Sequence, residues 1–214
     1  MKCGQKKKVF LQPTTKTMET TFFLYTLVFT IGCLIFDWIF IHFAPKRCRK
    51  SYHGSPLHSY YLSIYVYQPL LICMFLANVP LCQMAGAICA YGIRDFPNIV
   101  GQWDLYFHHF CMIAFTATAA MTPEWPHALF FTTGVFLECG SWTKNVAYLM
   151  IGTRHFRLVA NVNQAVMAVS HMVGLYLCYT LYHTEVSAFF KVTLPLGLIP
   201  TMVVRQYYSY KLGL

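Results

Sequence analysis

The sequence predicts an all-α fold, a bundle of transmembrane helices that crosses a bilayer about six times, with seven crossings as the alternative. Of the 214 residues, 57% are hydrophobic and only 11% are charged. That charged share is about half the value of a soluble domain, so the chain cannot cover a water-facing surface. Aromatic residues make up 17%, which is typical of a surface that faces lipid and reaches headgroup depth at its edges.

Six apolar runs have roughly the 20 residues that a helix needs to cross the hydrocarbon core. No small-residue cleavage site follows the first run and Asp37 interrupts it, so we expect an uncleaved anchor rather than a signal peptide. The last run carries Pro195 and Pro200, which are expected to kink it. The run at 81–93 is apolar but short, and it predicts a half-helix or an interfacial segment. The predicted spans are 20–43, 60–79, 104–121, 126–151, 158–182 and 186–207.

We therefore predict one membrane domain at 20–209, between a basic N-terminal tail at 1–19 and a short C-terminal tail at 210–214. The net charge is +9, and many basic residues flank the first apolar run. This placement suits anionic headgroups and topology signals, and it argues against a nucleic-acid partner. With six spans, the side of the N-terminus holds ten basic residues against four, counting Arg94 and Arg205 as loop residues. That excess predicts that both termini are cytosolic.

Ionisable residues inside the predicted spans are candidates for a functional site, because each costs about 2.5–3.5 kcal/mol at the bilayer centre. Asp104, His108 and His109 lie together at the start of the third span. Asp104 and His108 are four residues apart, so they share a helix face and the carboxylate can orient the imidazole. We therefore predict these three residues as catalytic candidates.

A second polar stripe lies on the fourth span, where Glu138, Ser141 and Asn145 follow one another at helical spacing. Only a short turn joins this span to the third, so the two stripes are expected to face each other. The sequence therefore predicts a buried polar cluster. We predict Glu138, Ser141 and Asn145 as substrate-binding residues, together with His171 of the fifth span, although a lone histidine there is more often typical of packing or cavity lining.

Three uses of the cluster remain open at this point. In the first, His108 or His109 acts as a general base or acyl acceptor, oriented by Asp104 or Glu138. In the second, histidines and a carboxylate hold a metal ion, although the nine cysteines form no CxxC pair and we predict no metal and no cofactor. In the third, the polar residues only pair helices. Asp37 is a potential partner of Lys144 or of a histidine.

These motifs resemble those of the TLC-domain family, whose members are polytopic endomembrane proteins with a histidine pair preceded by Asp and followed, about one span later, by Glu. Family members often have a basic residue two positions after the Asn of the motif. In this chain that Asn is Asn145, and the position is occupied by Ala147, which departs from the family pattern. The resemblance implies a multi-pass protein of the endoplasmic reticulum or a related membrane. The matching residues are Asp104, His108, His109, Glu138, Ser141 and Asn145.

The family includes ceramide synthases, which transfer a fatty acyl group from acyl-CoA and carry further Asp residues after the histidine pair. The stretch 111–140 holds no Asp, so the chain is more similar to the smaller TLC proteins that are implicated in phospholipid composition, lipid sensing or cargo handling. A fatty-acid elongase is disfavoured, because Leu105 stands where its box has a first histidine.

The resemblance thus implies a lipid-handling protein that influences phospholipid or sphingolipid composition through a pocket of histidines and Glu138. Its expected partners are membrane lipids and other membrane proteins. One alternative is an acyltransferase-type enzyme that uses His108 and His109 with acyl-CoA as co-substrate, and the sequence leaves open whether the chain is an enzyme. Another alternative is a structural subunit of a larger membrane complex.

Overall fold

A computed structural model describes residues 15–43, 51–52, 55–99, 103–122 and 127–213. The all-α prediction is confirmed, since strands in this part are limited to the two-residue antiparallel pair β1 (Ser51–Tyr52) and β2 (Ser55–Pro56). The bundle consists of α1 (Thr15–Phe43), α2 (Leu57–Leu62), η2 (Ser63–Tyr67), α3 (Gln68–Leu76), α4 (Leu81–Asp95), η3 (Phe96–Asn98), α5 (Trp103–Met121), α6 (His127–Leu149), α7 (Phe156–Tyr182) and α8 (Ala188–Gly213).

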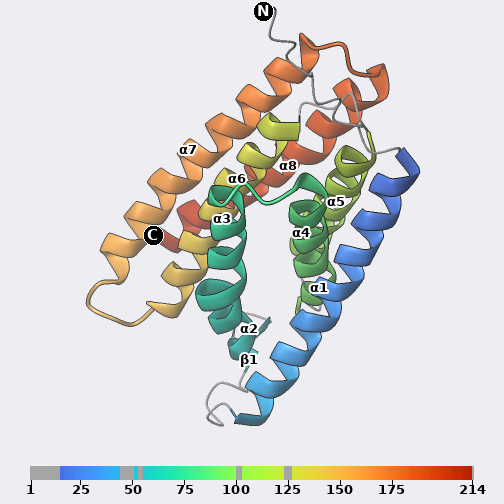
Figure 1. Cartoon of the computed structure of the whole chain (residues 1–214). Helices are drawn as coiled ribbons and strands as arrows, with labels where there is room; N and C mark the ends of the chain where they lie inside the picture. Colours follow the sequence, from blue (N-terminus) through green and yellow to red (C-terminus); the bar gives the residue numbers. More distant parts are fainter. Residues whose placement is uncertain (1–14, 44–50, 53–54, 100–102, 123–126, 214) are drawn as a thin grey trace, which may run out of the picture.

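Successive helices run in alternate directions through the bundle (Figure 1). Because α2, η2 and α3 form one continuous helix, the described part contains a helix at each of the six predicted spans and α4 as a seventh. The start of α1 and the end of α8 consequently lie at opposite ends of the bundle (Figure 1). The predicted cytosolic placement of both termini requires an even number of crossings, so this arrangement does not support it. The tails at 1–14, the residue 214 and the basic run at 46–50 lie outside the described residues.

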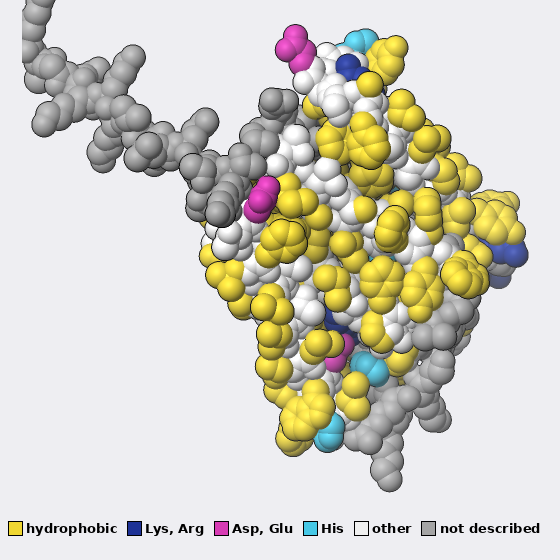
Figure 2. All heavy atoms as spheres, turned by 90° about the vertical axis from the view of Figure 1, so that its right-hand side faces the viewer, with side chains coloured by type: hydrophobic (Ala, Val, Ile, Leu, Met, Phe, Trp, Pro, Cys, Tyr) yellow, Lys and Arg dark blue, Asp and Glu magenta, His cyan; other side chains and the backbone are white. Residues whose placement is uncertain are grey.

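Four of the described helical stretches are long and apolar enough to cross a membrane: Met18–Phe43, Leu57–Leu76, Phe156–Tyr182 and Ala188–Gly213. A fifth, Leu105–Met121, is apolar but shorter. Large apolar side chains cover most of the face that Figure 2 shows, and Phe23, Leu27 and Trp38 of α1 are each more than half exposed. An exterior of this kind fits a membrane protein.

The short run predicted as a half-helix or an interfacial segment forms α4, which stands inside the bundle between α1 and α5. At 15 residues it is only about 22 Å long. Burial extends around nearly its whole circumference, which is the pattern of an internal helix and excludes the interfacial alternative. Its small residues permit close packing, because the Cα of Gly86 lies against the backbone of α1 at Tyr25 and Thr26.

Prolines shape two of the helices. Pro69 lacks an N–H and its ring crowds the carbonyl of residue 65, which explains the widened π turn of η2 immediately before it. That widening displaces Ser63 and Tyr67 toward the interior, where both are buried. The predicted kink residues Pro195 and Pro200 lie within α8, which remains helical through both.

Candidate functional site: a polar cavity beside an apolar one

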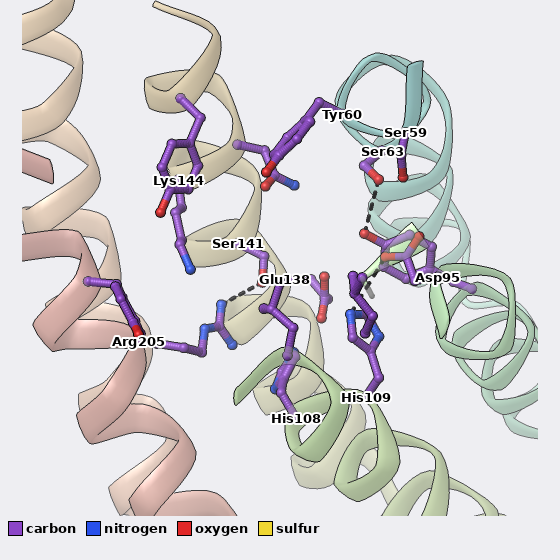
Figure 3. A pocket seen from close by; sticks show the side chains of 16 residues that line it. Ser59, Tyr60, Ser63, Asp95, His108, His109, Glu138, Ser141, Lys144 and Arg205 are labelled. Atoms are coloured by element: carbon purple, nitrogen blue, oxygen red, sulfur yellow. Dashed lines mark hydrogen bonds and ion pairs between the residues drawn. The ribbon is translucent and has the colours of Figure 1, made fainter. Parts of the chain in front are cut away.

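A polar cavity of about 410 Å³ opens between α2, η2, α4, α5, α6 and α8. This volume is within the range of small-molecule sites. Five of the seven predicted site residues line it: His108, His109, Glu138, Ser141 and Asn145. The two polar stripes of the sequence therefore meet across one space, as Figure 3 shows for four of these residues.

The other two predicted site residues are Asp104 and His171. Asp104 belongs to the first turn of α5, but its side chain lies outside the described part, so the pairing with His108 stays a prediction. His171 is buried on α7 and is not among the residues that line the cavity. Its polar ring therefore does not belong to this site, because α7 packs behind α6 and α8.

The histidine pair enters the cavity from α5, with ring centroids 5.2 Å apart. His109 is buried, and its Nε2 lies 3.6 Å from Asp95 Oδ2. Its Nδ1 has no hydrogen-bond partner among the described residues. Asp95, at the end of α4, thus takes the orienting position for His109 that the sequence assigned to Asp104 or Glu138.

The α6 wall carries Glu138, Ser141, Asn145 and also Lys144 on one face. Glu138 is 7% exposed, and Gln68 Nε2 donates a hydrogen bond of 3.3 Å to its Oε2. The Lys144 ammonium lies 5.7 Å from the ring centre of Tyr148 and 5.7 Å from that of Tyr208. Both contacts are within cation–π range.

Arg205 of α8 completes the basic side of the cavity (Figure 3). It was expected in a cytosolic loop, but α8 continues to Gly213 and the side chain is 5% exposed. Its Nη2 donates to the Leu137 carbonyl at 3.0 Å and to Ser141 Oγ. The ion pairs within the described residues do not include Arg205.

Arg94 was also expected in a loop, and it too is buried, at 1% exposure. Its Nε lies 2.7 Å from Asp37 Oδ2 and its Nη2 lies 3.0 Å from Asp37 Oδ1, a bidentate pair between α4 and α1. Nη1 contacts Asp95 and donates to Ser59 Oγ at 2.9 Å. The partner of Asp37 is therefore Arg94, and the expected pairing with Lys144 or a histidine is wrong.

The signal that the sequence offered for Arg94 was indirect. Asp37 interrupts an apolar span, so its carboxylate needs a basic partner inside the bundle. Arg94 directly follows the short apolar run at 81–93 and could supply that partner. Arg94 and Arg205 were missed as interior residues because Arg94 directly follows the short run at 81–93 and Arg205 lies near the end of the predicted span 186–207.

A second, apolar cavity of about 90 Å³ adjoins the polar one. His108 and Glu138 line both cavities and thus stand at the boundary between them. The remaining walls are mostly apolar and come from α5, α6, α7 and α8, including Phe115, Leu137 and Leu198. Together the two cavities offer adjoining polar and apolar environments.

Within the described residues, no group of three or more His, Cys, Asp or Glu side chains is arranged to hold a metal ion. Comparisons with protein-family models, with curated proteins and with solved structures found no match. The function is therefore argued from the geometry of the site.

Proposed function

We propose that this chain is a multi-pass membrane protein that handles lipids, and that the polar cavity binds a lipid headgroup. The observation that carries this proposal is the junction at His108 and Glu138, two residues that line both a polar cavity of about 410 Å³ and an apolar one of about 90 Å³. A molecule with a polar head and an apolar tail matches such a junction. The motif resemblance to TLC-domain proteins supports the same proposal, including a place in the endoplasmic reticulum or a related membrane and an influence on lipid composition.

Pairing of helices alone explains the cavity poorly. Polar side chains that serve only to join membrane helices bond directly to one another, as Thr143 Oγ1 does to Asn163 Oδ1 at 3.2 Å between α6 and α7. At the cavity, in contrast, the polar groups surround open space, and His109 Nδ1 has no partner among the described residues. A buried polar group of this kind is normally satisfied by a ligand or water.

Acyl transfer is the second candidate, and the pairing of His109 with Asp95 favours it. A carboxylate beside one ring nitrogen makes the other nitrogen more basic, and in this scheme His109 Nδ1 takes the proton of a hydroxyl or amine acceptor. Acyl-CoA is the acyl donor that the resemblance suggests: the acceptor oxygen or nitrogen bonds to the acyl carbon, the thioester C–S bond breaks, and the CoA thiolate leaves with the proton that His109 took up. This chemistry needs no residue beyond those in the cavity.

The test is a lipidomic comparison of membranes from cells that express the wild type or His108→Ala/His109→Ala at equal levels. We expect the wild type to change the abundance or acyl composition of one lipid class, and the double variant to lose that change. The matched control is His155→Ala/His183→Ala, because both of these histidines are exposed and outside the cavity. Identical lipid profiles for wild type and His108→Ala/His109→Ala would count against the proposal.

Mass spectrometry of lipids that co-purify with the protein distinguishes lipid binding from acyl transfer. If the double variant loses a bound lipid while cellular acyl composition is unaffected, binding is the function. If cellular acyl composition changes with the wild type alone, the histidines take part in a reaction.

A further inference from the structure

We propose that the lipid bound in the polar cavity carries an anionic group, a carboxylate or a phosphate, and that Arg205 and Lys144 hold that group. This inference rests on the proposed function, because it names the chemical class of lipid that the same cavity takes. Its basis is the electrostatics of the two basic side chains and their position beside the apolar cavity.

Arg205 is a buried cation whose hydrogen bonds go only to neutral groups. Both of its hydrogen bonds come from Nη2 and go to the Leu137 carbonyl and to Ser141 Oγ. No carboxylate of the described residues forms an ion pair with it. A guanidinium has five N–H donors, and burying its charge is costly unless an opposite charge compensates it. The cavity is the space from which such an anion can reach it.

Lys144 brings a second cation to the same side. It projects from α6 and Arg205 from α8, and Figure 3 shows both beside Ser141, across the cavity from Asp95, Ser59 and Ser63. The aromatic rings of Tyr148 and Tyr208 flank the ammonium. Both cations of the cavity therefore lie on the side formed by α6 and α8, where Glu138 also lies, and Asp95 and the serine hydroxyls lie on the side formed by α2, η2 and α4.

Glu138 is the carboxylate that could neutralise Arg205 from within the protein. It accepts a hydrogen bond from Gln68 of α3, and its charge interacts with that of Arg205 without a direct ion pair. Planar carboxylates and phosphates suit the fork of a guanidinium, which binds them through two parallel N–H bonds. In Arg205 both hydrogen bonds of Nη2 are already used, whereas Nε and Nη1 make no hydrogen bond to a described residue and keep N–H groups that can each donate a charge-assisted bond to an anion.

The position of Leu137 indicates that the anion belongs to a lipid and not to free phosphate. Its carbonyl accepts a hydrogen bond from Arg205, while the same residue lines the apolar cavity. An anionic group on Arg205 therefore lies close to the apolar cavity, whose lining shares Glu138 and His108 with the polar one. Inorganic phosphate would leave that cavity unfilled.

The experiment measures binding to the full chain purified in mild detergent. The probes are lysophosphatidic acid and oleate as anionic single-chain lipids, monooleoylglycerol as the neutral lipid with the same chain, and inorganic phosphate. We expect the wild type to bind at least one anionic lipid more tightly than monooleoylglycerol. We expect Arg205→Gln to weaken that anionic binding by roughly 10- to 100-fold, the value of a charge-assisted hydrogen bond, and to leave monooleoylglycerol binding unchanged.

Lys211→Gln is the matched control, because Lys211 also lies over an aromatic ring, that of Tyr207 at 5.2 Å, but is exposed and outside the cavity. This variant should bind every probe as the wild type does. If Arg205→Gln does not fold, Lys144→Gln tests the same basic side, and a weaker affinity for the anionic lipid alone is again the supporting result.

Equal affinity of the wild type for the anionic and neutral lipids, unaltered by Arg205→Gln or Lys144→Gln, would overturn this inference and leave the proposed function standing. Binding of inorganic phosphate without binding of any lipid would overturn the lipid assignment together with the proposed function. Binding of none of the four probes would overturn both as well.

Discussion

Two buried arginines, Arg94 and Arg205, differ in whether the protein supplies an ionic partner for their charge. Arg94, on the α1–α4 side, has Asp37 as a bidentate partner, Asp95 as a second carboxylate, and the ring of Tyr67 at 4.8 Å from its Cζ. Arg205, on the α6–α8 side, bonds only to a carbonyl and a hydroxyl. The first charge is compensated by ion pairs within the protein, whereas the second lies beside the cavity without an ion pair to a described residue.

This difference separates a structural role from a binding role. A fully paired arginine joins the helices that supply its partners, here α1 and α4, and has no charge to offer a ligand. An arginine with neutral partners adds little to stability, because the cost of removing its charge from water is not repaid within the protein. Buried charge alone therefore does not identify a ligand site, whereas buried charge without an ionic partner does point to one.

The largest expected effect comes from removing the paired arginine. Arg94→Gln should lower the free energy of unfolding by about 3–5 kcal/mol, because it leaves Asp37 and Asp95 buried without a cation. Arg205→Gln should change it by about 1 kcal/mol or less, because the loss of two hydrogen bonds is offset by the relief of a buried charge. Unfolding of the purified protein by sodium dodecyl sulfate in mixed micelles, followed by circular dichroism, measures both values. Equal losses for the two variants would contradict the comparison.

The two sides of the bundle also differ in how closely their helices pack. A Cβ added at Gly86 would lie 2.9 Å from the backbone nitrogen of Thr26, which cannot move without shifting α1. A Cβ added at Gly140 would lie 2.7 Å from Ser170 Oγ and 3.1 Å from Met167 Sδ on α7, and both of these are side-chain atoms. The α1–α4 contact is thus limited by backbone, and the α6–α7 contact by side chains that can rotate.

Gly86→Ala should therefore destabilise the protein by about 1–3 kcal/mol, the usual cost of overpacking. Gly140→Ala should be close to neutral, since a helix gains about 1 kcal/mol when alanine replaces glycine and the side-chain clash is cheap to relieve. The same unfolding assay measures both variants. A larger loss for Gly140→Ala than for Gly86→Ala would show that the α6–α7 contact is the rigid one.

A small effect is also expected from the loss of a hydrogen bond that joins helices away from the cavity. Thr143→Val removes the bond from Thr143 Oγ1 to Asn163 Oδ1 between α6 and α7 and should cost only about 0.6 kcal/mol, the average for such bonds in a membrane protein. Lipid binding should stay at the wild-type level, because Thr143 does not line the cavity. Reduced lipid affinity in Thr143→Val would mean that helix pairing controls the site.

Much of the site could be predicted from the sequence because its key residues lie on two neighbouring helices at regular spacing. Glu138, Ser141 and Asn145 follow the helical repeat, so they had to share a face, and the short connection between α5 and α6 placed that face toward His108 and His109. Local geometry and chain connectivity were enough for these five residues. The pairing of Asp104 with His108 remains a prediction.

Contacts between helices distant in sequence could not be predicted in this way. Arg94 and Asp37 are separated by 57 positions, and Arg205 and Ser141 by 64, so no local spacing relates them. The count of basic loop residues treated both arginines as solvent-exposed. Arg94 follows the run at 81–93 but belongs to α4, and Arg205 lies near the end of the predicted span 186–207 while α8 continues to Gly213. The short apolar run of α4 was underestimated, since small residues make a weak apolar signal but allow close packing.

The sequence by itself determined the composition of an apolar bundle, the approximate position of its helices and the polar stripes of α5 and α6, because these follow from residue chemistry and the repeat of the α-helix. Only the tertiary structure decided which charges are paired. That choice depends on which helices lie side by side, and it gives Arg94 two carboxylates while it leaves Arg205 facing a cavity. The ionic partner of a buried charge is set by packing over long separations in the chain, which residue spacing does not record.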